Sequence, residues 1–398
     1  MTENNGRFVQ IHALVSYPPS NLNRDDMGRP KTAVMGGKPR LRISSQSMKR
    51  AWRESEFFSD ALSGHVGYRT RKLGIYVKEA LTGGLRLSTH LKEKSLKEKS
   101  PKEYEPLDEE MATEWALSIS KVFYENPKKK NNKDNNQDNT KDKSNKKKTK
   151  EDDKLTRSQL IHLSNLEVQE IDSKLLEIAR NRESPEQPCD QSSFVLKKIS
   201  DVDIALFGRM LTAAPDKNID AAAQVAHPIT IHPVVVEDDY FTAVDDLNSH
   251  EEDAGAAHLG VNEYGAGVFY TYVCVNRELL IENLGDDVEL ANRAIGALVE
   301  CVAKVGPKGK QNSYASRAYA SYLMVEQGSQ QPRSLAAAFL GPMSGNNYLL
   351  DGISRLEMEC QALDTAYGLC ADGRCVLNVP EGKGTLQDIL KFVSGKDA

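Results

Sequence analysis

The chain of 398 residues lacks the features of a membrane-bound or exported protein. It has no run approaching the ~20 consecutive apolar residues that a membrane-spanning helix needs, so we expect no contact with a membrane. The first seven residues lack the apolar centre of a signal peptide, which predicts a cytoplasmic protein. The six cysteines form no CxxC pair and show no zinc-ligand spacing, so we expect free thiols in a reducing compartment. A bridge between Cys370 and Cys375 is the alternative.

Signals for a metal or a cofactor are also sparse. His227 and His232 fall on opposite faces of a predicted strand, and no cysteine or carboxylate is placed to complete a metal site with them. Structural roles are therefore expected for both histidines. The Gly36-Gly37-Lys38 turn resembles a phosphate-binding loop but lacks the GxxxxGK[ST] spacing, so we expect neither an ATP site nor any other cofactor.

Positive charge, by contrast, is concentrated in residues 21–53. The whole chain has a formal net charge of −5, yet this stretch contains nine cations and only two acidic residues, Asp25 and Asp26. The cations are Arg24, Arg29, Lys31, Lys38, Arg40, Arg42, Lys49, Arg50 and Arg53. Such a local excess is typical of a surface that contacts a phosphate backbone.

A helix within this stretch separates an apolar face from a cationic one. Ser44 and Ser45 are good N-cap residues for it. The stripe predicted to face a core contains Met48, Ala51, Trp52 and Ser55. The roughly opposite stripe contains Gln46, Lys49, Arg50 and Arg53. Because the N-terminal N–H groups of a helix attract anions, the basic face and the Ser-Ser-Gln corner together favour nucleic-acid contact over a merely solvated surface.

The remaining pattern predicts strands and helices that alternate along the chain. Strands are expected at residues 8–17, 41–43, 201–207, 229–236, 268–275 and 321–326, with a turn at 208–210. Helices are expected at residues 45–58, 107–124, 155–179 and 291–305, and the polar, acidic segment 237–267 favours a projecting hairpin. His12, in the middle of the first strand, is predicted to be a hydrogen-bonded structural histidine. This arrangement is typical of an α+β fold of the ferredoxin or RRM type.

Residues 128–153 contain no apolar side chain. Burial cannot offset the entropy lost on ordering such a segment, so we expect a disordered or mobile loop. Its lysines could touch nucleic acid, but the acidic residues among them favour a solvated linker.

Several long motifs carry a family resemblance. They are LNRDDMGRPKTAVMGGKPRLRISSQSMKRAWR, DIALFGRM, AHPITIHPV, DDYFTAVDDL, AHLGVNEYGAGVFY and GPKGKQNSYA. In this order they resemble the CasC-type backbone subunit of type I-E CRISPR Cascade complexes, a member of the RAMP superfamily. The resemblance runs from residue 7 to about residue 320 and is weak in residues 57–198 and in the last seventy or so residues.

The resemblance implies an RRM-like palm with a helical fingers insertion and a β-hairpin thumb. The palm would comprise residues 1–60, 199–234 and 269–398, the fingers 61–198 and the thumb 235–268. It also implies a helical filament of several copies along CRISPR RNA, whose guide bases pair with a target DNA strand. Other Cascade subunits would be further partners. Each thumb would reach over a neighbouring copy and kink the RNA.

Matched residue by residue, the resemblance implies a set of RNA contacts. The expected RNA-binding residues are Arg24, Lys31, Ser44, Gln46, Lys49, Arg50, Met210, Lys310, Gln311 and Tyr314. The expected thumb residues beside the displaced base are Phe241, Thr242, His258 and Leu259. Phe241 and Leu259 could instead be minor core residues.

The family implies a binding subunit without catalytic residues. An enzymatic alternative comes from related type III backbone subunits, which cleave RNA with a loop aspartate, a role that Asp25 or Asp26 could take. Metal nucleases usually need several convergent carboxylates, and the sequence offers only this pair in the basic stretch.

Overall fold

The computed structural model describes residues 6–96, 99–124, 155–157, 159–185, 189–190, 193–197, 199–243 and 258–395. The chain forms two compact units. Unit 1 comprises residues 1–63, 222–281 and 287–398, and unit 2 comprises residues 64–221 and 282–286. The predicted disordered insert at 128–153 lies outside the described residues.

An antiparallel sheet forms the centre of unit 1. Its main path runs in the order β11-β10-β1-β9-β6, and β7 and β8 also pair with β9. The strands are β1 (Phe8–Ser20), β6 (Ala223–Val225), β7 (Ile229–Thr230), β8 (Glu237–Ala243), β9 (His258–Asn276), β10 (Ala320–Gly328) and β11 (Gly373–Asn378). Central strand β1 pairs Ile11 with both Val273 and Val325. Its length and alternating β-branched residues make it the strand that organises the unit.

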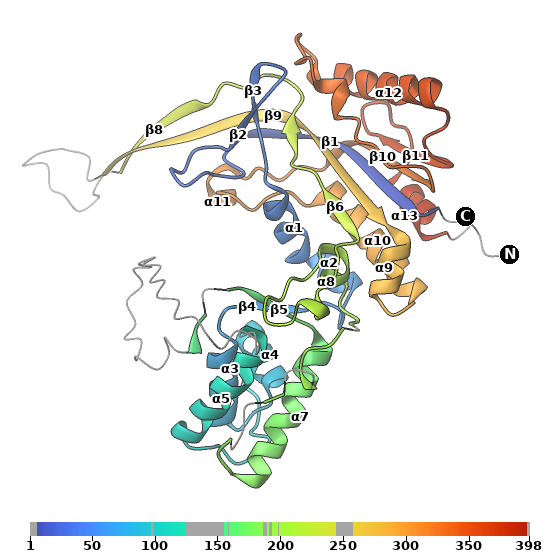
Figure 1. Ribbon diagram of the computed structural model, residues 1–398. Helices are drawn as coiled ribbons and strands as arrows, with labels where there is room; N and C mark the ends of the chain where they lie inside the picture. The colour runs from blue at the N-terminus through green and yellow to red at the C-terminus, as the bar shows by residue number, and fades with distance from the viewer. Residues whose placement is uncertain are drawn as a thin grey trace, which may run out of the picture. The chain divides into compact units, whose positions relative to one another are not determined.

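Helices pack on this sheet, with α12 on one side and α10 and α13 on the other (Figure 1). The helices of unit 1 are α1 (Ser45–Arg53), α2 (Glu56–Ala61), α9 (Arg277–Asn283), α10 (Val288–Lys304), α11 (Gln311–Tyr314), α12 (Tyr348–Tyr367), α13 (Leu386–Ser394) and the 3-10 helix η3 (Ala336–Phe339). Under α12, the core joins Leu14 and Tyr270 of the sheet to Ile353 and Leu356 of the helix. The predicted mixture of antiparallel sheet and helices is confirmed, while the RRM assignment stays a prediction.

A buried polar network lies within unit 1 and includes His12. The Tyr270 hydroxyl oxygen accepts a hydrogen bond from the Leu335 N–H at 3.0 Å. The same hydroxyl donates its proton to His12 Nδ1 at 2.8 Å. His12 Nε2 lies 3.2 Å from Glu326 Oε2, so the neutral ring donates its remaining proton to this carboxylate. Burial lowers the pKa of His12 despite the nearby carboxylate. The prediction of a hydrogen-bonded structural histidine is confirmed.

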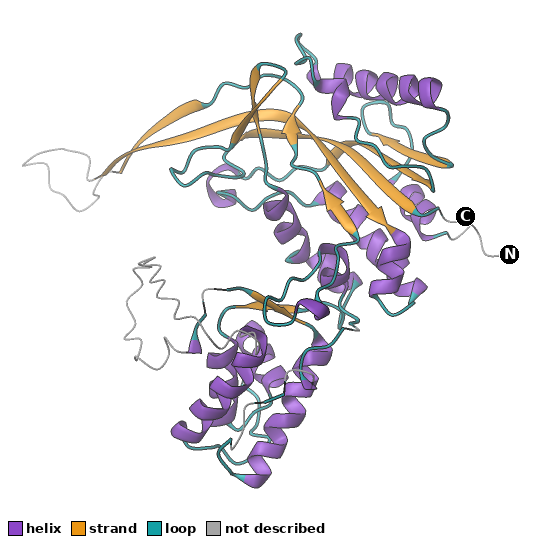
Figure 2. Cartoon of the chain, in the orientation of Figure 1, coloured by secondary structure: helices purple, strands orange, loops and turns teal. Residues whose placement is uncertain are grey.

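Unit 2 is largely helical (Figure 2). It contains strands β4 (Tyr68–Thr70) and β5 (Ile161–Leu163), and 3-10 helix η2 (Pro215–Lys217). Its α-helices are α3 (Leu73–Gly83), α4 (Leu87–Leu96), α5 (Glu109–Tyr124), α7 (Asn165–Asn181) and α8 (Val202–Phe207). A capping box between Ser164 and Glu167 starts α7, and buried Glu167 also binds Arg209 at 2.7 Å.

The palm, fingers and thumb boundaries stay predictions. Residues 199–221, which the resemblance assigns to the palm, group with unit 2. Within the expected thumb, β8 and β9 are antiparallel partners, as in a hairpin. Residues 244–257, between the described parts of these strands, lie outside the described residues.

The strand predicted at 201–207 is wrong, because Val202–Phe207 form helix α8. Five of its six residues are buried, including Asp203, which accepts hydrogen bonds from the Gly67 N–H and the His162 ring. A short helix surrounded by protein has no polar face, so its apolar run resembles a buried strand. The strand predicted at 229–236 shrinks to Ile229–Thr230, since Pro233 cannot donate to a ladder.

Other boundaries also differ from prediction. The helix expected at 45–58 is two helices, because Ser55 caps a second one by accepting from the Phe58 N–H. The helix expected at 155–179 begins only at Asn165 and follows strand β5. The strand expected at 41–43 lies earlier, as β3 (Lys38–Leu41), paired with β2 (Thr32–Met35). All six cysteines are free, as predicted.

None of the helices in the described part of the chain combines the length and apolar character that a bilayer crossing requires.

Candidate nucleic-acid interface

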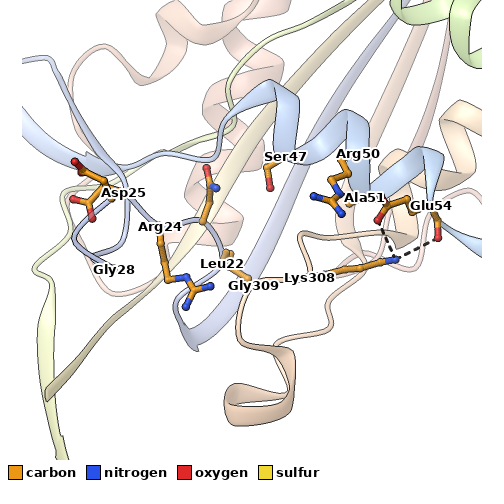
Figure 3. A pocket seen from close by; sticks show the side chains of 12 residues that line it. Leu22, Arg24, Asp25, Gly28, Ser47, Arg50, Ala51, Glu54, Lys308 and Gly309 are labelled. Carbon is orange, nitrogen blue, oxygen red and sulfur yellow. Dashed lines mark hydrogen bonds and ion pairs between the residues drawn. The ribbon is translucent and has the colours of Figure 1, made fainter. Parts of the chain in front are cut away.

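A cleft of about 490 Å³ in unit 1 contains part of the predicted basic stretch, including Arg24 and Arg50 of its nine cations. Three segments line it: the loop after β1, the outer face of α1 and the turn before α11 (Figure 3). The lining residues are Leu22, Asn23, Arg24, Asp25, Asp26, Gly28, Ser47, Arg50, Ala51, Glu54, Lys308 and Gly309. The walls combine three cations (Arg24, Arg50 and Lys308) with three carboxylates (Asp25, Asp26 and Glu54) and with hydroxyl and amide groups, so the cleft is polar and presents charges of both signs.

Local hydrogen bonds hold the loop after β1 in shape. Asp25 Oδ1 accepts from the Met27 N–H at 3.0 Å and from the Arg29 N–H at 2.9 Å. Asn23 Oδ1 accepts from the Ser44 N–H at 2.8 Å, which ties the loop to the start of α1. The carboxylate of Asp25 therefore has a structural use as a turn-forming acceptor.

Helix α1 has the orientation that its sequence predicts. Ser44 caps it by accepting from the Ser47 N–H, and its first turn contains no acidic residue. Met48, Ala51 and Trp52 are buried, and the Trp52 indole donates to the Val305 carbonyl at 3.2 Å. Burial of this stripe leaves Gln46 and Arg50 exposed and Lys49 half-buried on the remaining surface.

Cations of the basic stretch differ in what surrounds them. Arg50 forms an ion pair with Glu54 at 2.8 Å, yet 73% of its side chain stays exposed. Arg24 is exposed in the cleft wall, and no carboxylate of the described residues pairs with it. Arg29 pairs with Glu263 at 3.0 Å. Solvent-accessible cations with few acidic partners can exchange water for phosphate oxygens.

Arg40 does not belong to this surface. It is fully buried and donates to the Thr230 carbonyl at 2.7 Å and to the Phe339 carbonyl at 3.0 Å. These bonds fix the β2–β3 hairpin to the loop at residue 340. The approach there is so close that a Cβ on Gly36 would lie 1.7 Å from the Leu340 carbonyl oxygen. Counting Arg40 among the surface cations was wrong.

The second predicted segment, around α11, lies beside β9. Lys310 Nζ donates to Asn262 Oδ1, and the Tyr314 ring lies 6.2 Å from the Tyr264 ring. Gln311 uses its amide within its own turn, where it donates to the Pro307 carbonyl at 3.0 Å and contacts Ser316 Oγ at 3.2 Å. Gln311 thus shapes this turn, while Lys310 connects it to the ribbon of β8 and β9.

The apolar residues predicted for the thumb are only partly described. In the β8–β9 ladder, Phe241 pairs with Gly260 and Thr242 pairs with Leu259. The Phe241 ring covers Gly260, where an added Cβ would lie 2.4 Å from a ring carbon, and 38% of Phe241 stays exposed. Phe241 is therefore not a core residue. Strand β9 begins at His258, but the side chains of His258 and Leu259 lie outside the described residues.

The remaining predicted contacts lie apart from the cleft lining. Met210 belongs to unit 2, where it is 75% exposed. Lys31 is half-buried, and its backbone N–H donates to the Asn23 carbonyl at 2.8 Å.

Neither histidine with a possible metal role joins a ligand cluster. His232 stacks on Tyr348 with ring centroids 4.1 Å apart and accepts from the Val268 N–H at 3.2 Å. His227 contacts Arg42. Within the described part of the chain, no three His, Cys, Asp or Glu side chains converge as metal ligands.

Sequence reasoning did not select Lys308, although it lines the cleft. Lys308 Nζ donates to the Glu54 carbonyl at 3.3 Å, which brings the turn before α11 against the end of α1. The Gly-Pro-Lys-Gly-Lys run was the available signal, but nothing in the sequence indicates which lysine faces α1.

Comparison with known proteins agrees with this architecture. The model of the CT1975-like protein family matches residues 9–391. A chain of a solved "CRISPR RNA-guided surveillance complex, pre-nicking" is 28% identical with a TM-score of 0.74, and the match covers 98% of this chain and 100% of that chain. A chain of another "CRISPR RNA-guided surveillance complex" is 24% identical with a TM-score of 0.55, over 98% of this chain and 100% of that one, and supports the fold alone. No curated protein matches.

The antiparallel sheet, its helices and the first structural likeness are consistent with the RAMP-like fold of Cas proteins. Because the family model matches nearly the whole length, the chain belongs to the CT1975-like protein family.

Proposed function

We propose that this protein is a CRISPR RNA-binding backbone subunit of a Cascade-type surveillance complex, of type I-E. The observation that carries the proposal is the likeness, over 98% of the chain, to a chain of a CRISPR RNA-guided surveillance complex. The polar cleft of unit 1, where Arg24 and Arg50 are exposed, supports it. Cytoplasmic assembly with CRISPR RNA, with further copies of itself and with other Cascade subunits follows from this proposal.

The cleft would hold RNA through its backbone. Arg24 and Arg50 supply positive charge from the cleft lining. Lys49 and Gln46 add a cation and an amide from the neighbouring surface of α1, beside its N-cap Ser44. Contacts of this kind hold phosphate and sugar without reading bases. Sequence specificity then belongs to pairing between guide and target DNA, as in other RNA-guided systems.

The β8–β9 ribbon would supply the periodic kink. Phe241 is a large, partly exposed ring on a two-stranded ribbon, and an apolar ring can replace stacking lost where a base is displaced. Thr242, His258 and Leu259 are the proposed neighbours at this kink. In a filament, each ribbon would act on RNA held by an adjacent copy.

We favour a binding role over catalysis. Asp25 Oδ1 already accepts two backbone N–H groups, which supports a structural use of this carboxylate. The alternative is a metal-dependent ribonuclease that uses Asp25 or Asp26. A cleavage assay with RNA paired to the guide, with and without Mg²⁺, and with Asp25→Ala and Asp26→Ala as controls, distinguishes the two roles. We expect no cleavage by the wild-type protein.

The direct test of function is purification of the protein from its native host, followed by sequencing of the RNA that co-elutes. We expect uniform short transcripts derived from CRISPR repeats. Random cellular RNA, or no RNA, would contradict the proposal.

A further inference from the structure

Arg42 has an unusual partner among the arginines of the basic stretch. Its guanidinium Nη1 lies 2.6 Å from the imidazole Nδ1 of His227. A guanidinium can only donate, so His227 Nδ1 must accept and its ring is neutral. The pKa of His227 lies below its ordinary value because of partial desolvation and then because of the charges of Arg42 and Lys31. His227 therefore orients the guanidinium without neutralising it.

Backbone pairing places Lys31 on the same side. The Arg42 N–H donates to the Lys31 carbonyl at 2.8 Å, which continues the β2–β3 ladder by one pair beyond Thr32 and Leu41. On its other side, Arg42 bridges Ile229 in antiparallel fashion. Directly opposed residues share a face, and so do residues two positions further along a strand. Lys31, Arg42 and His227 therefore share one face.

This face holds two opposed cations without acidic compensation. In the described part of the chain, no carboxylate lies within ion-pair distance of Lys31 or Arg42, in contrast to the pairs Arg29–Glu263 and Arg50–Glu54. Like charges directly opposite one another are destabilising. An anion bound between them relieves this repulsion and gains charge-assisted hydrogen bonds from the fixed guanidinium.

We infer that Arg42, oriented by His227 and flanked by Lys31, forms a phosphate-binding site for one phosphodiester of a nucleic-acid strand. The inference rests on the proposed function and deepens it, because it adds Arg42 as a ligand-contacting residue and His227 as a positioning residue. The planar guanidinium can bind two phosphate oxygens at once, whereas Lys31 contributes a less directional charge. The site lies just before the N-cap of α1, so one strand can contact it and the α1 surface in succession.

The test measures binding of a fluorescent single-stranded RNA of mixed sequence between 50 and 300 mM KCl. Arg42→Gln, His227→Ala and His227→Asn are compared with wild type. Lys391→Ala, which removes an exposed cation of α13, is the matched charge control. We expect Arg42→Gln to weaken binding roughly 3- to 10-fold and to reduce the slope of log K against log[salt] by about 0.7, the loss of one single-strand phosphate contact. His227→Ala should weaken binding less, and His227→Asn, whose side-chain oxygen can still accept from Arg42, should restore it.

Thermal unfolding of each variant shows that the fold is kept. Arg42→Gln could bind RNA with the same affinity and salt slope as wild type while Lys49→Ala binds more weakly. That outcome would overturn this site and leave the proposed function in place. Equal losses for Arg42→Gln and Lys391→Ala would also overturn it, because net charge alone would then explain the effect. If wild type binds no RNA at all, the proposed function fails and this inference fails with it.

Discussion

Unit 1 contains two groups of arginines that differ in what faces them. Arg333 and Arg374 surround the fully buried Glu326, at 2.5 Å each, and Arg374 also binds Asp364 at 2.9 Å. An arginine thus serves the fold where buried acceptors hold it, whether carboxylates as at Glu326 or backbone carbonyls as at Arg40. Arg24 and Arg42, by contrast, lack a carboxylate partner in the described part of the chain, and Arg24 is exposed.

Removing the carboxylate from the first group should have the largest effect. Glu326→Gln leaves two guanidinium groups near an uncharged amide inside the protein, so we expect a loss of about 3–5 kcal/mol in the free energy of unfolding. Glu54→Gln is the matched control, because its ion pair with Arg50 is exposed and should contribute under about 1 kcal/mol. Urea denaturation measures both. Similar losses for the two variants would remove the distinction between the groups.

Arg40 belongs to the basic stretch but is buried, so its substitution separates an effect on stability from an effect on RNA binding. Arg40→Ala removes two buried hydrogen bonds from a charged donor, so we expect a loss of about 2–3 kcal/mol of stability. The folded variant should keep the salt dependence of RNA binding, since Arg40 is buried. A reduced slope would show that Arg40 reaches RNA and that burial does not separate the two groups.

Lowering the pH should reduce the stability that the buried cluster around Glu326 contributes to the fold. Burial alone would raise the pKa of Glu326, but hydrogen bonds from His12 and Arg333 outweigh it and lower that pKa. The stability from ionised Glu326 is therefore complete above its unfolded value, about 4.3, and is lost as the pH falls below it. The pKa of His12 is lowered by burial, so its contribution begins to decline below about 6.5.

Denaturation at pH 7.5, 5.5 and 4 checks this dependence. Stability of the wild type should fall at each step, and Glu326→Gln should flatten the decline below pH 5. A wild-type stability that rises on acidification would contradict the assignment of a neutral His12 beside an ionised Glu326.

The smallest stability effect is expected at Phe241. Phe241→Ala removes a ring that covers Gly260 on the ribbon, at a cost of no more than about 1 kcal/mol. We nevertheless expect a clear change in the bound RNA, measured as the fluorescence of 2-aminopurine placed at successive guide positions. Wild type should show a periodic increase where bases unstack, and the variant should lose it. Unchanged periodicity would assign the kink to other residues.

The sequence was most informative where a pattern has one interpretation. Helix α1 was predicted from its cap residues Ser44 and Ser45 and from the apolar stripe that contains Trp52, and the structure has the cap at Ser44 and Trp52 buried. Strands β1 and β9 were equally clear from their β-branched and aromatic residues. Helix α8 was mistaken for a strand because Val202, Ile204 and Leu206 alternate with Asp203, Ala205 and Phe207, a period-two pattern that six residues are too few to distinguish from a short, mostly buried helix.

The candidate site was less predictable than the helix that contributes to it. The sequence shows nine cations in residues 21–53, but it does not show which of them form ion pairs or are buried in the folded chain. Arg29 pairs with Glu263 and Arg40 binds Phe339, residues more than 200 positions away, so only the folded chain reveals them. Lys308 was missed for the same reason, since its contact is with Glu54 at the end of α1.

The most direct test of the account is the salt dependence of RNA binding by Arg24→Ala and Lys49→Ala, measured on two RNAs of unrelated sequence. The account predicts that each variant weakens binding to both RNAs by the same factor and lowers the slope of log K against log[salt] by about 0.7. An unchanged slope, or a loss confined to one of the two sequences, would contradict backbone binding by these cations.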